Sequence, residues 1–140
     1  MKKIFLIIII TTLSKNINAQ IGVPDTLAYL NTVVLNKNNY IGQPFSVLYN
    51  NLQIQIKFFN PYAAIHYDMN KETSTTLSFY YSLTEEDYHL TYPRLEVFWQ
   101  IPQNINQSLA LWKKNKWGWW DTAVYNLYKN AIIKDIKVFD

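Results

Sequence analysis

Apolar residues recur at intervals of three and four in the first third of the chain, which is the period of an amphipathic helix. The positions are Leu27, Leu30 and Val34. Together with Pro24, which suits a first helical turn, they predict a helix over about 24–36. Gly42 then marks a turn, and a second, shorter helix is predicted to begin at Pro44. We expect the two helices to form a hairpin.

From residue 52 onward, apolar and polar residues alternate, as in a strand with one buried and one solvated face. The alternation predicts three strands, over 54–58, 76–81 and 94–101. We expect the first strand to end at Asn60 and Pro61, and a polar turn over 68–72 to precede the second strand. Pro93 and Pro102 are expected to bound the third strand. In the third strand we expect one face to hold Leu95, Val97, Trp99 and Ile101.

The C-terminal part predicts two more helices and one more strand. A short helix is expected near 108–113, and a second helix, capped by Asp121 or Thr122, up to about Asn130. The last strand is expected over 132–139. The order predicts an α+β fold: an N-terminal helix hairpin followed by an antiparallel sheet of about four strands, with a further helix before the last strand and the helices on one face.

The first nineteen residues have the charged, apolar and small-residue order of a secretory signal peptide. The apolar run at 4–10 is shorter than the roughly 20 residues that a membrane-spanning helix needs. We therefore predict cleavage near Ala19, with residues 1–19 as the signal peptide and 20–140 as a single domain without a transmembrane segment. The mature protein would lie in the periplasm or outside the cell. Uncleaved anchoring is the alternative, because Ile17 is larger than the usual residue at that place.

Loss of this segment changes the charge of the protein. The whole chain has 13 Lys and Arg against 10 Asp and Glu, and Lys2, Lys3 and Lys15 would be removed with the signal peptide. The mature domain would then carry ten charges of each sign. Nucleic acid binding requires a clustered excess of Lys and Arg, so this balance argues against a nucleic acid partner.

The chain has no cysteine, so neither disulfides nor thiolate metal ligands are available. Its core must therefore be stable without crosslinks. Five Trp, eleven Tyr and seven Phe supply large apolar areas that can provide that stability.

The most unusual motif is a run of tryptophans and lysines near residues 112–120. Indole rings can stack on sugar faces or hold a peptide, and lysines and amides can add directional hydrogen bonds. The candidate ligand-binding residues are Trp117, Trp119, Trp120 and Lys116. Alternatively, and favoured for the run as a whole, the tryptophans lie beneath the loop and anchor the next helix. Trp117 and Trp119, on either side of Gly118, are the pair expected to be exposed.

A second motif is the acidic group Glu85, Glu86 and Asp87, close to His89. These residue types could serve acid and base chemistry, bind a divalent cation or contact a protein partner. Adjacent carboxylates between two strands are more often a solvated turn. We therefore assign the three acids only as candidate partner-binding residues.

No motif of nucleophilic, phosphate-binding or metal-binding chemistry occurs in the chain. A zinc site would need both histidines, His66 and His89, together with carboxylates from distant segments. We therefore assign no catalytic residue, no metal and no cofactor. A small hydrolase that uses one of these histidines with a carboxylate is the least favoured alternative.

The segment from Tyr40 to Leu48, a glycine turn followed by a helix, resembles small exported domains built of a helix hairpin and a sheet. Examples are the outer-membrane assembly lipoproteins of the SmpA/OmlA type and the beta-lactamase inhibitor proteins. The composition and signal also resemble small secreted proteins of Bacteroidetes-type bacteria. From the sequence as a whole we predict a monomeric or weakly associating, non-catalytic binding or assembly module of the cell envelope that recognises a protein or a glycan. A secreted inhibitor or immunity-type protein is the alternative.

Overall fold

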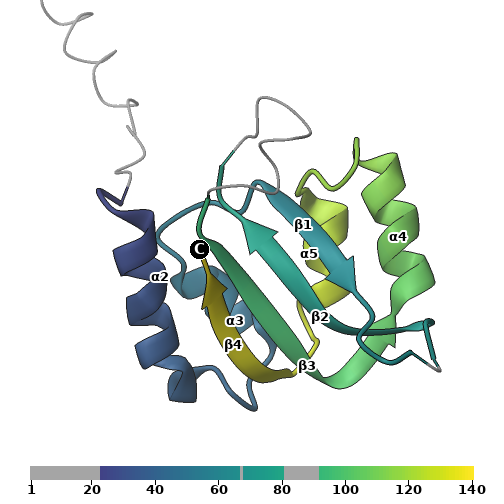
Figure 1. Cartoon of the computed structure of the whole chain (residues 1–140), viewed down its shortest axis with the longest axis horizontal. Coiled ribbons are helices and arrows are strands. Elements are labelled where there is room, and N and C mark those ends of the chain that lie inside the picture. The colour runs from purple at the N-terminus through teal and green to yellow at the C-terminus, as the bar shows by residue number, and fades with distance from the viewer. Residues whose placement is uncertain (1–22, 67, 81–91) are drawn as a thin grey trace, which may run out of the picture.

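The computed structural model describes residues 23–66, 68–80 and 92–140. Within these ranges the chain has an α+β fold with four α-helices and a four-stranded antiparallel sheet (Figure 1). The elements are, in order, α2 (Thr26–Leu35), the 3-10 helix η2 (Lys37–Asn39), α3 (Phe45–Asn51), β1 (Phe58–Tyr62), β2 (Lys71–Ser78), β3 (Arg94–Asn104), α4 (Ile105–Lys114), α5 (Thr122–Tyr128) and β4 (Ile133–Phe139). The strands follow one another across the sheet in the order β1-β2-β3-β4. The predicted α+β class with an antiparallel sheet of four strands is therefore confirmed.

Both N-terminal helices are present close to their predicted bounds. The Asp25 side chain caps α2 by accepting a hydrogen bond from the Ala28 amide at 3.0 Å, and α3 follows directly after Pro44. The helix α2 buries Leu30 and Val33 and lies against β4. The pairing of the two helices as a hairpin stays a prediction.

The predicted bounds of the first two strands are wrong. The strand β1 covers Phe58–Tyr62 and includes Pro61, which the sequence placed at its end. Because β1 is an edge strand, the missing amide proton of a proline need not cost a hydrogen bond of the sheet. The strand β2 begins at Lys71, inside the predicted turn, and a shift of register between Glu72 and Ser74 interrupts its alternation.

The third predicted strand is confirmed in its first half. Leu95, Val97 and Trp99 are buried on one face, but Ile101 is 71% exposed, contrary to the prediction. The pairing of β3 with β4 shifts register between Phe98 and Trp99, and residues beyond this irregularity no longer follow the same alternation. The strand also continues past Pro102, the predicted boundary, to Asn104.

The C-terminal elements agree with the sequence pattern. The Asp121 side chain accepts a hydrogen bond from the Val124 amide at 2.9 Å and so caps α5, as predicted. The helix α4 covers the predicted 108–113 and begins three residues earlier, and β4 falls within the predicted 132–139.

The core lies between the sheet and the helices. Figure 1 shows α3 and α5 behind the sheet, α2 beside β4 and α4 beside β1. The buried side chains from the sheet are Phe59, Leu77, Leu95, Val97, Trp99, Ile133 and Ile136, and those from the helices are Leu30, Val33, Phe45, Leu48, Val124 and Tyr128. None of the helices in the described ranges is long and apolar enough to cross a membrane.

Loops of the helical layer pair with both edges of the sheet. The Phe59 amide donates to the Gly118 carbonyl at 2.9 Å, and the Trp120 amide donates to the Lys57 carbonyl at 2.9 Å. At the other edge, the Gly42 amide donates to the Ile133 carbonyl at 2.8 Å. Such pairing protects exposed strand edges from other chains. It also brings the tryptophan motif beside the segment that leads into β1.

Candidate ligand-binding cleft

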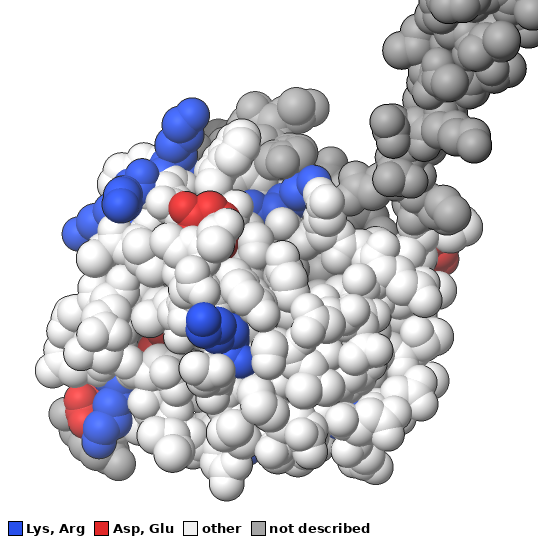
Figure 2. Space-filling view, turned by 180° about the vertical axis from the view of Figure 1, so that it is seen from behind, with Lys and Arg blue, Asp and Glu red and all other residues white. Residues whose placement is uncertain are grey.

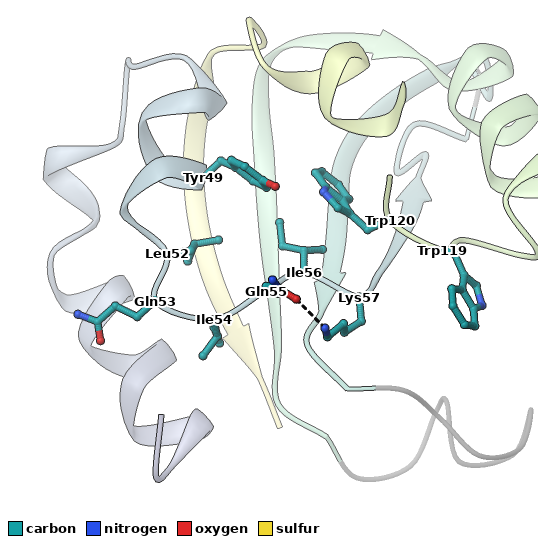
Figure 3. Close-up of a pocket in the computed structure, with 9 residues that line it drawn as sticks. All are labelled: Tyr49, Leu52, Gln53, Ile54, Gln55, Ile56, Lys57, Trp119 and Trp120. Atoms are coloured by element: carbon teal, nitrogen blue, oxygen red, sulfur yellow. Dashed lines mark hydrogen bonds between the residues drawn. The ribbon is translucent and has the colours of Figure 1, made fainter. Parts of the chain in front are cut away.

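A cleft with a volume of about 370 Å³ opens between the end of α3, the extended segment that follows it and the segment before α5. Its lining consists of Tyr49, Leu52, Gln53, Ile54, Gln55, Ile56, Lys57, Trp119 and Trp120 (Figure 3). The volume falls within the range of small-molecule sites, and the lining combines apolar side chains with a few polar groups, as such sites do.

One wall of the cleft is a pair of stacked aromatic rings. The centroids of Tyr49 and Trp120 are 6.0 Å apart and their planes differ by 24°. Tyr125 packs on Tyr49 at 4.6 Å, and Phe45 lies edge-on to Trp120 at 6.0 Å. Because neighbouring rings and the hydrogen bond from the Trp120 amide to Lys57 hold this wall, its rings are in place before any ligand arrives.

Trp119 forms the outer end of the cleft. Its side chain is 43% exposed, and Figure 3 shows it directed away from Trp120. The ring of Trp119 lies edge-on to Phe58 at 5.6 Å, and the Lys116 ammonium group lies 5.6 Å from its centroid. A cation over an indole face is a favourable contact. Trp119 therefore keeps a defined position despite its exposure.

Amide groups supply the polar part of the lining. The Lys57 ammonium group donates to the Gln55 side-chain oxygen at 2.8 Å (Figure 3), and the Gln53 amide of the main chain donates to the Tyr29 hydroxyl at 2.9 Å. Lys57 is the only charged residue in the described lining, and no charged residue occurs in the sequence from 38 to 56. Figure 2, which views the molecule from behind the sheet, shows Lys and Arg side chains mainly over the left half and centre of this face and a largely uncharged area at the lower right.

The loop before Trp119 has an uncommon backbone conformation. Lys116 and Trp117 have positive φ angles of 47° and 64°, and Gly118 has a φ of 107°. A Cβ atom on Gly118 would lie 2.6 Å from both the Phe59 carbonyl oxygen and the Trp112 Nε1 atom. Residues other than glycine rarely adopt such φ angles, so the surrounding contacts must hold the loop in place.

The structure brings together two of the four predicted ligand-binding residues. Trp119 and Trp120 line the cleft, whereas Lys116 contacts it only through the Trp119 ring. Trp117 lies outside the lining, packs edge-on against Trp112 at 5.1 Å and is 62% exposed. The expectation that Trp117 and Trp119 are exposed is confirmed.

The sequence did not identify Tyr49 or the segment 52–57 as part of a site. The only sequence signal was the long run from 38 to 56 without a charged residue, and such a run by itself also fits a buried region. The acidic residues Glu85, Glu86 and Asp87, like His89 and the predicted signal peptide at 1–19, lie outside the described residues. His66 is exposed in the connection between β1 and β2. Within the described ranges, no three His, Cys, Asp or Glu residues come together as a metal site.

A buried carboxylate lies in the core, and sequence reasoning did not single it out. Glu72 is fully buried and accepts hydrogen bonds from the hydroxyls of Thr75 and Ser108, and from that of Tyr128 at 2.8 Å. The Trp99 indole donates to the Thr75 hydroxyl at 2.9 Å. Burial raises the pKa of Glu72 above its ordinary value, while the three hydroxyl donors act in the opposite direction. Burial, and then the nearby Glu72 charge, raises the pKa of Tyr128 well above 10.

Comparisons with protein-family models, curated proteins and solved structures find no match to this chain. The resemblance to envelope assembly lipoproteins and inhibitor proteins therefore stays a prediction. The geometry of the cleft is the basis for a functional assignment.

Proposed function

We propose that this protein is an exported, monomeric binding module of the cell envelope whose cleft recognises a glycan. The observation that carries the proposal is the cleft itself, whose lining combines the aromatic residues Tyr49, Trp119 and Trp120 with the amide side chains of Gln53 and Gln55 (Figure 3). Export is the expectation from the predicted signal peptide.

The lining suits the chemistry of a sugar. A pyranose ring has apolar C–H faces that pack on aromatic rings, and its hydroxyl edges require donors and acceptors close by. Side-chain amides provide both in one group. Leu52, Ile54 and Ile56 add an apolar surface beside these amides. An N-acetylated sugar, which carries a methyl group next to an amide, combines the same two features, so soluble peptidoglycan fragments are the first ligands to test.

The lining supports binding more than glycoside cleavage. Glycosidases generally require two carboxylates on either side of the scissile bond, and no Asp or Glu contributes to the cleft among the described residues. A cleft of about 370 Å³ has the size of a small-molecule site, which is consistent with a short glycan. A protein partner would have to contact the surface beyond the cleft as well, because a stable protein interface needs about 1,000 Å² or more of buried area.

Calorimetric titration of the purified protein with N-acetylglucosamine oligomers and soluble peptidoglycan fragments tests the proposal. Trp119→Ala should weaken binding by roughly two- to tenfold, the equivalent of an aromatic contact of about 0.5–1.5 kcal/mol. Trp117→Ala is the matched control, because Trp117 is an exposed indole of the same loop outside the cleft. Absence of binding by the unaltered protein, or equal losses in the two variants, would refute the assignment.

A further inference from the structure

A series of stacked aromatic rings connects the cleft to the buried carboxylate of Glu72. Tyr49 stacks on Trp120 at 6.0 Å, Trp120 lies 6.5 Å from Tyr128 with the planes 12° apart, and Tyr128 lies 5.3 Å from Trp99 at 10°. The Tyr128 hydroxyl donates to Glu72 at 2.8 Å. A contact path of nearly parallel rings thus runs from the wall of the ligand site to a group that can change its charge.

The hydrogen bonds around Glu72 are directed toward the carboxylate. The Trp99 indole nitrogen can only donate, so the Thr75 hydroxyl accepts there and its single proton is left for Glu72. The hydroxyls of Ser108 and Tyr128 donate to the same carboxylate. An ionised carboxylate accepts all three protons, whereas a neutral carboxyl group has one proton of its own to donate.

We propose that Glu72 and Tyr128 are positioning residues for the cleft: the carboxylate holds the Tyr128 hydroxyl, and the Tyr128 ring fixes the plane of Trp120. The relevance of this support to sugar binding rests on the proposed function. The remaining contacts of the Trp120 ring, with Phe45 at 6.0 Å and Phe59 at 6.2 Å, are edge-on, so Tyr49 and Tyr128 provide the parallel faces.

A change in the charge of Glu72 should then alter the environment of the Trp120 ring. Hydrogen bonds to an ionised acceptor are roughly twice as strong as those between neutral groups, so protonation of Glu72 loosens the Tyr128 hydroxyl. The groups that face the carboxylate are Thr75 of β2, Ser108 of α4 and Tyr128 of α5, with Trp99 of β3 behind Thr75. Of these, only Tyr128 titrates, and its pKa lies well above 10. At lower pH, a pH-dependent change at Trp120 that is transmitted through the Tyr128 ring therefore reports the protonation of Glu72.

The test is the ¹H–¹⁵N indole signal of Trp120, assigned with Trp120→Phe and followed over roughly pH 4 to 8 without any ligand. In the unaltered protein the signal should shift with a midpoint above 4.5, because burial raises the pKa of Glu72. Tyr128→Phe keeps the ring but removes the hydroxyl, and Glu72→Gln removes the titrating group. Each variant should abolish the shift.

Ser108→Ala is the matched control, because it removes a donor from α4 to the same carboxylate and leaves both the ring and the hydroxyl of Tyr128 in place. The pH response of Trp120 should persist in this variant with its midpoint at higher pH, since the ionised form has lost one hydrogen bond. A Trp120 signal that ignores pH in the unaltered protein, or that responds equally in Tyr128→Phe, would overturn the proposal. Failure of glycan binding would refute the proposed function alone, because this experiment uses no sugar.

Discussion

Replacement of Glu72 by Gln removes a buried charge while nearly preserving the shape of the side chain. The Gln carbonyl oxygen can accept the protons of Thr75 and Tyr128 in place of the carboxylate. Its amide group can donate to the Ser108 hydroxyl, whose own proton can turn to the Asn104 carbonyl oxygen 3.4 Å away. Each of these groups keeps a partner, so the variant should fold.

The sign of the effect on stability follows from the direction of the pKa shift. Burial raises the pKa of Glu72 in the folded protein above 4.5, so the folded state binds this proton more tightly than the unfolded chain. The stabilisation is fully present below 4.5 and is lost as the pH rises through the folded-state pKa. Within this window the unaltered protein loses at most about 1.4 kcal/mol per pH unit through this group, and Glu72→Gln has no such loss. The variant should therefore gain stability relative to the unaltered protein as the pH rises.

Urea unfolding of both proteins at half-unit pH steps from below 4.5 to neutrality measures this difference. The pKa values of Asp68 and Asp135 are lowered by hydrogen bonds from Lys71 and Lys37, which makes stability rise with pH in the acidic range. These contributions are common to both proteins and cancel in the difference. Two curves that run parallel across the whole range would show that Glu72 titrates alike in the folded and unfolded chain, contrary to this reasoning.

Two further substitutions test the local structure that positions the cleft. Gly118→Ala should destabilise the protein by roughly 2–5 kcal/mol, because a Cβ there would meet a backbone carbonyl oxygen of β1 at 2.6 Å and φ is positive. Gly42→Ala is its control: φ is also positive, but nothing lies within 4 Å of the added Cβ, so thermal unfolding should show only about 1–2 kcal/mol of loss. Asp121→Ala should lower the free energy of unfolding in urea by about 1 kcal/mol, because the α5 cap is lost. Asp121→Asn can still cap the helix and should keep most of that stability.

The sequence pattern predicted the elements whose alternation or helical period is unbroken. Leu95, Val97 and Trp99 were placed correctly because the alternation of buried and less buried residues is unbroken from Arg94 to Trp99. The pattern failed where the sheet is irregular. The register shift between Glu72 and Ser74 hides the start of β2, and beyond the one between Phe98 and Trp99 the alternation stops, with Gln100, Ile101 and Pro102 all exposed. The position of a bulge depends on how the strand pairs with its partner, so the periodicity of the strand's own sequence does not predict it.

The cleft could be predicted only in part, for a related reason. Trp119 and Trp120 stand out as an aromatic motif, but Tyr49 is some seventy residues away and resembles any partly buried tyrosine. The two parts meet because the segment around Gly118 pairs with the start of β1, a tertiary contact without a sequence signature. Glu72 was missed because a glutamate near a turn is usually solvated, and only its buried partners reveal its role.

A glycan site in this cleft is tested by following all five indole ¹H–¹⁵N signals while N-acetylglucosamine oligomers or soluble peptidoglycan fragments are added. The signals of Trp119 and Trp120 should shift together and saturate, while the signal of Trp117, which is on the same loop but outside the lining, should shift much less. Indole signals that remain unchanged at saturating sugar, or a shift confined to Trp117, would contradict a glycan site in this cleft.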